Sequence, residues 1–151
     1  IISSIFKKNS KYMKIIKLLQ KKLFKYKNYN NFLSVLDLIM IIFKFKSSEI
    51  LLNYLIKNLK YSLKNKQFIF IMFIKNLLKQ YFKYKHKFTT NIYGLKIQIK
   101  GKINSSNRTK TTILNYGKTP LHTIKIKVNY SFQHFINKDG AFGIKVWFFY
   151  I

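Results

Sequence analysis

The 151-residue sequence contains no cysteine and only three acidic residues. The absence of thiols excludes disulfide bonds, cysteine nucleophiles and cysteine-ligated metal centres. The three carboxylates, on Asp37, Glu49 and Asp139, lie far apart in the sequence, which argues against the paired acids of general acid–base catalysis. The sequence therefore predicts a protein that is not an enzyme and that uses no metal ion, no cofactor and no small-molecule substrate.

Long apolar runs are also missing. No segment reaches the roughly 18 uncharged apolar residues of a transmembrane helix. The two longest candidates, residues 32–43 and 68–74, have the length of buried core elements, and Asp37 interrupts the first.

What the sequence has in excess is positive charge. Its 30 Lys and Arg residues, of which only Arg108 is an arginine, give a formal net charge of +27. A protein with this charge repels itself, so we expect a polyanionic partner. Nucleic acid and an anionic membrane surface are the two physical candidates.

The composition is biased towards residues with A/T-rich codons, because Ile, Lys, Asn, Phe and Tyr make up 92 of the 151 residues. This bias indicates an AT-rich genome, such as that of an organelle, and it lowers the weight of any single lysine or apolar run. The hydrophobic fraction of 48% still exceeds that of a disordered polycation, so a folded core is predicted.

The first 31 residues are predicted to form a basic amphipathic helical extension. Apolar residues recur there at steps of three and four between lysines, at Tyr12, Ile15, Ile16, Leu19, Leu23 and Tyr26. Residues 28–31, Asn-Tyr-Asn-Asn, mark its boundary, and residues 32–46 are expected to end in a buried strand. The folded domain is expected to span residues 32–151.

Two helices are predicted next. Ser47 and Glu49 form a helix start, with a hydroxyl cap and an acid in the first turn. The apolar face of this helix is expected at Leu52, Leu55, Ile56, Leu59 and Leu63. Residues 67–85 fit a second helix, although 68–74 alone would fit a strand, and a basic loop at 83–91 follows.

All five glycines and the single proline lie in the last third of the chain, where apolar and polar residues alternate as in half-buried strands. Four strands are predicted, at residues 95–100, 109–116, 124–129 and 144–151. The joints between them are rich in turn residues and lie at 104–107, 115–118 and 137–140. Short turns favour sequential antiparallel pairing. The expected fold is therefore α+β, with two helices packed on one face of a mostly antiparallel four- to five-stranded sheet.

Few residues besides the lysines suggest a site. His122, at an expected strand start, is interpreted as a structural residue, and His86 as a loop residue near phosphate. Trp147 is interpreted as a core residue or a protein contact, with base stacking as the alternative. The glycines of 140–143 have the GxxG spacing of a backbone clamp, but the same spacing also makes an ordinary turn into a strand.

Three segments, 94–103, 117–130 and 140–148, carry a resemblance to a known family. The sharpest blocks are Pro-Leu-His-Thr at 120–123 and Gly-Ile-Lys-Val-Trp at 143–147. Together they resemble the C-terminal domain of the third protein of the small ribosomal subunit, in its bacterial and organellar form. With the two upstream helices, the resemblance covers the whole predicted domain.

The resemblance implies a structural constituent of the small ribosomal subunit, here of a mitochondrion, with another AT-rich organelle as the alternative. The protein would bind ribosomal RNA in the head of the subunit near the messenger entry side, beside neighbouring head proteins and mRNA, and would support translation. Its lysines would neutralise RNA phosphates, so binding would weaken steeply with salt. The residues expected to face RNA are Lys96, Lys100, Lys102, Arg108, Lys118, Lys125, Lys127 and Lys145.

These basic residues have two interpretations. If the apolar side chains of the strands face the helices, one set of lysines shares the opposite face of the sheet: Lys96, Lys100, Lys102, Lys125 and Lys127. Like charges on one sheet face are unfavourable until phosphates neutralise them. The alternative is a solvated lysine face in a lysine-rich composition, and Lys145 could point along a different face.

Two departures from the family are expected to matter. The family carries an RNA-binding KH domain ahead of this one, but residues 1–93 contain no glycine for a KH clamp loop, so no KH domain is predicted in this chain. That half is lost, highly diverged or made as a separate chain. On the second helix, apolar residues replace a basic cluster that helps to unwind messenger: Ile69, Phe70, Phe73 and Ile74. We expect an apolar protein contact there and no unwinding, unless a shifted register lets Lys75 and Lys79 substitute.

The alternative function is that of a membrane-surface protein, which lies on anionic lipid through its N-terminal amphipathic helix with Tyr12 and Phe24 inserted. This alternative leaves the glycine-spaced strands from Gly94 onward unexplained. A nucleic-acid enzyme would need metal-binding carboxylates, which three scattered acids do not supply.

Overall fold

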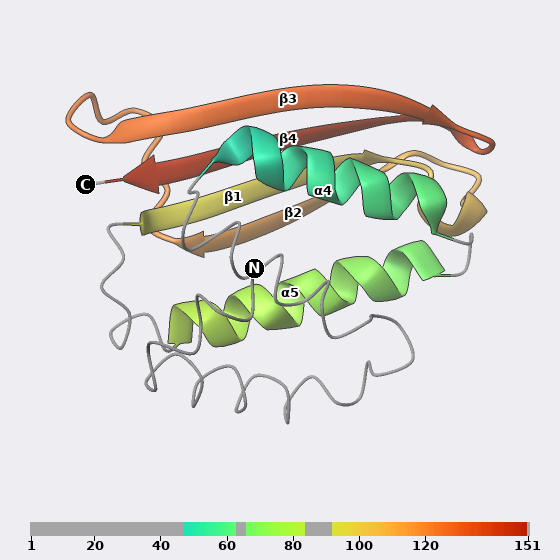
Figure 1. Ribbon diagram of the computed structural model, residues 1–151, viewed down its shortest axis with the longest axis horizontal. Helices are drawn as coiled ribbons and strands as arrows, with labels where there is room; N and C mark the ends of the chain where they lie inside the picture. The colour runs from blue at the N-terminus through green and yellow to red at the C-terminus, as the bar shows by residue number, and fades with distance from the viewer. Residues whose placement is uncertain (1–46, 63–65, 84–91, 151) are drawn as a thin grey trace, which may run out of the picture.

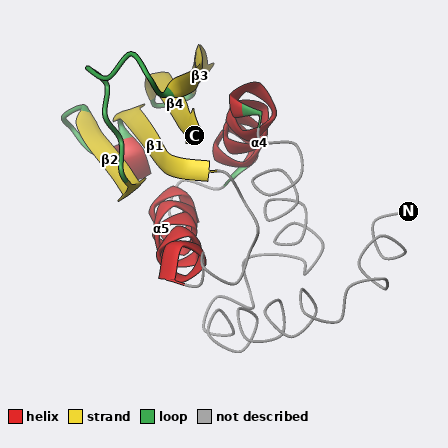
Figure 2. Cartoon of the chain, turned by 90° about the vertical axis from the view of Figure 1, so that its left-hand side faces the viewer, coloured by secondary structure: helices red, strands yellow, loops and turns green. Residues whose placement is uncertain are grey.

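A computed structural model describes residues 47–62, 66–83 and 92–150 of the protein. Within these ranges two helices lie on one side of a four-stranded sheet, as Figure 1 and the end-on view of Figure 2 show. The elements are α4 (Ser48–Tyr61), α5 (Gln67–Lys83), β1 (Ile92–Gly101), the short 3-10 helix η5 (Ile103–Ser105), β2 (Lys110–Gly117), β3 (Lys127–Asn137) and β4 (Gly140–Tyr150). The predicted α+β class is confirmed. The predicted extension, the strand before residue 47 and the loop at 84–91 lie outside the described residues.

Helix α4 begins as its sequence predicts. The Ile50 backbone N–H donates a hydrogen bond to Ser47 Oγ at 3.4 Å, and Glu49 lies in the first turn, where the helix dipole favours an acid. The next residue fixes the helix to the sheet, because Ser48 Oγ donates to Asn129 Oδ1 at 2.7 Å and pairs with Ser131 Oγ at 2.5 Å. The start of α4 is thereby tied to β3.

Residues 67–83 form a helix throughout, so the strand alternative for 68–74 is wrong. A mutual pair of hydrogen bonds holds the start of this helix, α5: Gln67 Oε1 accepts from the Asn104 N–H at 3.2 Å, and Asn104 Oδ1 accepts from the Phe68 N–H at 3.1 Å. On β2, the Tyr116 hydroxyl donates to the Lys75 carbonyl at 2.8 Å. Helix α5 is thus joined to the sheet side at two points along its length.

The apolar surface predicted on α5 is wrong for three of its four residues. Phe70, Phe73 and Ile74 are buried in the hydrophobic core, and only Ile69 is exposed. The reason is that the apolar stripe of α5 is wide around the helix, so these three side chains face the core together with the other buried residues of the helix. Tyr54 of α4 contacts Phe70 with ring centroids 6.5 Å apart.

The sheet has the order β2-β1-β4-β3, and every neighbouring pair is antiparallel. Sequential pairing was therefore the wrong prediction for β2 and β3, which form opposite edges. The physical reason is the connection at residues 118–126, which is a crossing rather than a short turn. It passes close over β1, because a Cβ built on Gly94 would collide with the Lys118 carbonyl.

The strand predicted at residues 124–129 is displaced along the chain. Strand β3 begins at Lys127, and Ile124 and Val128 are exposed rather than half-buried. The apolar alternation at 124–128 therefore does not mark a core face. The other predicted strands match β1, β2 and β4 to within a few residues at each end.

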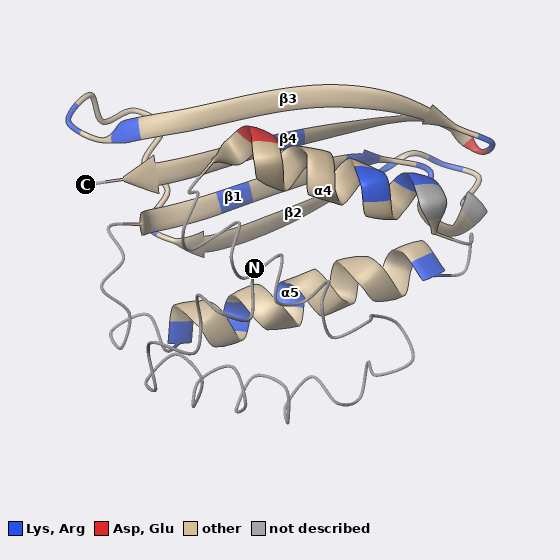
Figure 3. Ribbon diagram, viewed as in Figure 1, with Lys and Arg blue, Asp and Glu red and all other residues tan. Residues whose placement is uncertain are grey.

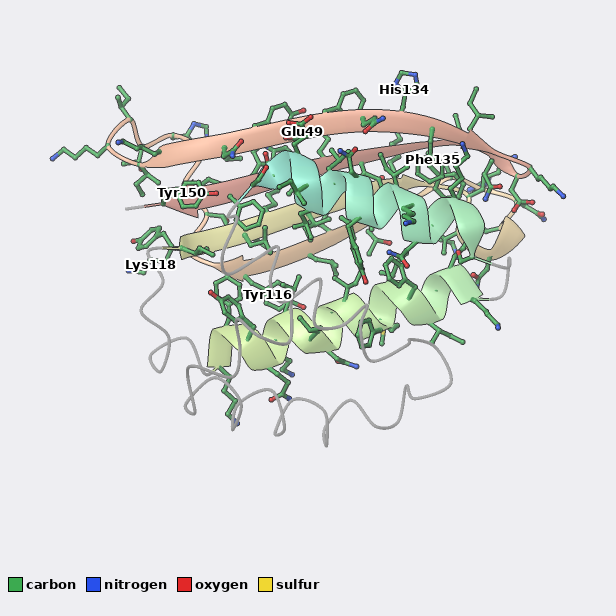
Figure 4. All side chains as sticks on the ribbon, in the orientation of Figure 1. Glu49, Tyr116, Lys118, His134, Phe135 and Tyr150 are labelled. Atoms are coloured by element: carbon green, nitrogen blue, oxygen red, sulfur yellow. The ribbon has the colours of Figure 1, made fainter. Side chains whose placement is uncertain are left out.

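The core lies between the helices and one face of the sheet. Strand β1 contributes Leu95, Ile97 and Ile99, and β4 contributes a matching set of buried side chains, Phe142, Ile144, Val146 and Phe148. At the edge of the core, Phe135 and Phe142 stack with centroids 5.2 Å apart and planes at 10°. Figure 4 shows the alternation on β3, where Phe135 points towards the helices and His134 points away.

Candidate nucleic-acid interface

The side of the sheet away from the helices carries a distinct set of side chains, which we call the open face. Strand register places them in rows across three strands. Each row runs from β1 through β4 to β3. The first row is Lys96, Trp147 and Tyr130, and the second is Gln98, Lys145 and Phe132. The third row is Lys100, Gly143 and His134. Ile113 of β2 adjoins the second row opposite Gln98. The open face therefore has lysines on its inner strands and rings along β3.

The predicted RNA-facing residues divide into separate groups. Lys96, Lys100 and Lys145 share the open face, so the doubt over Lys145 is resolved in favour of this face. Lys118 and Lys125 lie in the β2–β3 connection. Figure 3 shows the basic residues spread over the strands and both ends of the sheet.

Three residues of the five-lysine set do not share the open face, so that prediction is wrong for them. Lys102 follows β1, and Lys125 precedes β3, so strand alternation does not govern either of them. Lys127 is exposed but lies opposite Tyr150, on the side of β3 that Asn129 and Ser131 share. The remaining predicted residue, Arg108, lies in the bend before β2.

Two aromatic rings of the open face, those of Tyr130 and Phe132, are the feature that the sequence analysis did not predict, whereas base stacking was its alternative for Trp147. Tyr130 is 49% exposed and Phe132 is 52% exposed, and Trp147 is half-buried on this face rather than in the core. The Tyr130 and Trp147 centroids are 5.2 Å apart. Alternation of rings with small polar residues at 129–134 was the available signal, but the rings would have been assigned to the core.

Two lysines of the open face lie over these rings. Lys96 Nζ lies 5.1 Å from the Trp147 ring centroid, and Lys145 Nζ lies 5.5 Å from that of Phe132. Both distances are within the range of cation–π attraction. The arrangement offers positive charge and flat apolar surface together, which is what single-stranded nucleic acid binds.

The family of the chain is decided by a match over slightly more than half of its length. A model of the family described as ribosomal protein S3, C-terminal domain, matches residues 72–148. The chain belongs to the ribosomal protein S3 family. The resemblance drawn from the Pro-Leu-His-Thr and Gly-Ile-Lys-Val-Trp blocks is thereby confirmed, and the family is a structural one rather than a family of enzymes.

Curated relatives agree with this S3 assignment. Small ribosomal subunit protein uS3 of Porphyromonas gingivalis is 37% identical over 54 residues, which is 36% of this chain and 22% of that protein. The uS3 proteins of Nautilia profundicola and Synechocystis are 36% and 34% identical over 56 and 58 residues, or 37% and 38% of this chain and 23% and 24% of theirs. These alignments thus span about a quarter or less of the relatives' own lengths.

The S3 match contains the whole candidate interface. Residues 72–148 include most of α5, strands β1 to β3 and β4 as far as Phe148, whereas α4 precedes the match. Every residue of the open face thus belongs to the matched region.

Acidic groups are absent from the open face within the part of the chain that the structure describes. Glu49 lies at the start of α4, and Asp139 lies in the β3–β4 turn. Tyr116 and Tyr150 lie on the other side of the sheet, packed against the core. Burial raises the pKa of Tyr150 to about 12, against a smaller lowering by the Asn129 hydrogen bond, and burial also raises the pKa of Tyr116. Among the described residues, the charged side chains on this face are therefore lysines.

The other candidate residues have simpler surroundings. His122 is exposed in the β2–β3 connection and is not at a strand start, and His86 lies outside the described residues.

Gly140 and Gly143 both belong to β4, directly after the turn from β3, so the turn interpretation of the GxxG spacing is confirmed. Among the residues that the structure describes, no group of His, Asp and Glu could hold a metal ion, and no helix has the length and apolarity to cross a membrane.

Proposed function

We propose that the protein is a structural constituent of the small ribosomal subunit, where it binds ribosomal RNA and supports translation. The single observation that carries this proposal is the family match over residues 72–148. The relatives are bacterial uS3 proteins, and this chain aligns with less than a third of each, so their role is extended to it by inference.

The physical basis of RNA binding is electrostatic. A net charge of +27 needs polyanionic neutralisation, and each phosphate that a lysine neutralises releases counterions. We assign this role to the predicted basic residues, on the open face and at the ends of the sheet: Lys96, Lys100, Lys102, Arg108, Lys118, Lys125, Lys127 and Lys145. Such contacts fix position rather than read sequence.

We infer the position of the protein in the subunit from its resemblance to the family. We assign it to the head of the small subunit near the messenger entry side, with head proteins and mRNA as neighbours. The A/T-biased composition supports a mitochondrial ribosome. The domain is assigned to residues 32–151, and the basic extension at 1–31 to RNA or a neighbouring subunit.

No KH domain is assigned to residues 1–93. The clamp loop of a KH domain needs closely spaced glycines, and residues 1–93 contain none. Messenger unwinding is not assigned to this chain. The burial of Phe70, Phe73 and Ile74 leaves those positions unable to present a basic cluster, whereas Lys75 and Lys79 are exposed on α5.

The test is sedimentation of a native organellar lysate at raised salt, followed by mass spectrometry of the small-subunit peak. We expect this chain in stoichiometric amount with the other subunit proteins. A companion polypeptide that carries a KH loop would show that the two halves are made as separate chains. Recovery only in the membrane fraction would favour the membrane-surface alternative, and recovery only as free protein would also contradict the proposal.

A further inference from the structure

The rings of the open face are unusual because nothing in the described fold requires them there. Tyr130 and Phe132 lie on the edge strand β3 with about half of their surface exposed, and Ile136, two positions beyond His134, is 75% exposed. These three side chains share one face of β3, and exposed apolar side chains gathered on one face are a feature of binding surfaces. The core on the other face of the sheet is complete without these side chains.

We propose that Tyr130, Phe132 and Trp147 stack the bases of an unpaired RNA segment, whose phosphates contact Lys96 and Lys145. This inference rests on the proposed function and names the conformation of RNA that the open face takes. A duplex buries the faces of its bases, whereas single strands expose them to aromatic side chains. The open face is therefore assigned to a loop, bulge or end of RNA.

The spacing of the side chains suits successive bases. Side chains two positions apart on a strand lie about 7 Å apart, so Tyr130 and Phe132 occupy neighbouring positions along β3. Trp147 extends the first row inward, at 5.2 Å from Tyr130. Four-stranded sheets of other RNA-binding domains stack two or three bases on aromatic side chains in this way.

A glycine leaves free space on the open face beside the Phe132 ring. Gly143 lies between Lys100 and His134 on the open face, and a Cβ built there would lie 3.6 Å from Cε2 of Phe132. The Phe132 ring thus leans over a position that has no side chain of its own. A larger residue at 143 would compete with a base for the space beside that ring.

Charge decides between RNA and a protein as the occupant. Lys96 and Lys145 hold their ammonium groups over the rings at 5.1 and 5.5 Å from the centroids. No carboxylate among the described residues lies on this face to neutralise them. A polyanion with flat apolar groups satisfies both features at once, and RNA has that chemistry.

The first test uses the full chain and two short probes of equal length: an oligouridylate, and an abasic oligomer with the same number of phosphates. We expect the oligouridylate to bind more tightly, on the order of tenfold for one stacked base. Phe132→Leu removes one of the three rings, so it should lower that advantage and leave abasic binding unchanged. Phe132→Tyr, which keeps a ring, should retain it. Equal binding of the two probes by the unaltered chain would overturn the proposal.

A matched control separates stacking from general apolar contact. Ile113 is 55% exposed on the same face but belongs to β2 and carries no ring. We expect Ile113→Ala to leave the ratio of oligouridylate to abasic binding unchanged. A loss equal to that of Phe132→Leu would overturn the stacking assignment. Circular dichroism of each variant checks that the fold is kept, as the exposure of both side chains predicts.

A second test works on assembled particles and does not depend on folding of the free chain. Ultraviolet irradiation of small subunits should yield nucleotide adducts on Tyr130, Phe132 or Trp147, detected by mass spectrometry of peptides. Absence of ring adducts, with a carbodiimide reagent instead cross-linking Lys96 or Lys145 to an acidic residue of a protein, would overturn the proposal. If the chain does not sediment with the subunit yet discriminates the two probes, the proposed function fails and the stacking assignment stands.

Discussion

Two pairs of aromatic rings bridge β3 and β4 at the same centroid distance, 5.2 Å, with opposite surroundings. Phe135 and Phe142 are buried between the sheet and the helices, whereas Tyr130 and Trp147 lie on the open face with Tyr130 49% exposed. The inner pair stabilises the fold by losing contact with water. The outer pair remains in contact with water, so a ligand that covers it would gain the same kind of stabilisation. The same strands thus carry structure on one side and a binding surface on the other.

The inner pair should be the more sensitive to truncation. Phe142→Ala removes a side chain that is 1% exposed and leaves a cavity, so we expect a loss of about 3–5 kcal/mol in the free energy of unfolding. Tyr130→Ala on the open face should cost less than about 1 kcal/mol. Urea unfolding of the full chain followed by circular dichroism measures both. Similar losses for the two variants would remove the distinction between the faces.

The two faces should differ again in the salt dependence of RNA binding. Replacing Lys96 and Lys145 together by glutamine should lower the slope of log K against log salt for an oligouridylate by roughly 1.4, because two phosphate contacts are lost. Lys57 and Lys60, exposed residues of α4 that lie away from the open face, serve as the control pair. If the control pair lowers the slope as much, the charge of the chain acts as a whole and not through one face.

Substitutions where α4 meets β3, on the helix side of the sheet, should have a smaller effect on the free energy of unfolding. Ser48→Ala removes the hydroxyl that bonds to Asn129 and Ser131, and we expect a loss of about 1–2 kcal/mol in the free energy of unfolding. Ser47→Ala, which removes the helix cap, should cost about 1 kcal/mol. Neither change should alter oligouridylate binding to the folded protein. A change in binding would show that the two faces are coupled.

The smallest effect is expected at Tyr150, at the end of β4. Its pKa is raised to about 12 by burial, while the unfolded chain has the ordinary value near 10. Between these values the unfolded state loses its proton and the folded state keeps it, so stability falls as the pH rises from 10 to 12. Tyr150→Phe should leave stability near pH 7 almost unchanged and make this fall shallower. An identical pH dependence in both proteins would contradict the assigned burial.

The sequence predicts well where local chemistry decides the structure. The cap at Ser47, the acid at Glu49 and the alternation from Leu95 to Ile99 each act within a few residues, and each prediction is confirmed. Strand order depends instead on the path of residues 118–126, whose crossing over β1 leaves no local pattern. The same crossing contains Lys125, whereas alternation along β3 places Lys127 on the side opposite the open face.

The candidate site could be predicted only in part for a related reason. Alternation identifies two faces of a strand but does not say which face is covered, and in β3 the rings lie on the uncovered one. Lys96, Lys100 and Lys145 were found because charge excludes them from a core. Tyr130 and Phe132 were missed because aromatic side chains are usually assigned to a hydrophobic core.

The most direct test of the open face is a lysine-modification footprint of purified small subunits. Lys96 and Lys145 should be protected from an amine-reactive label, and Lys57 and Lys60 on α4 should serve as references away from that face. Ribonuclease digestion should restore labelling of Lys96 and Lys145 if RNA covers them, as the account predicts. Equal labelling of these two lysines before and after digestion would contradict it.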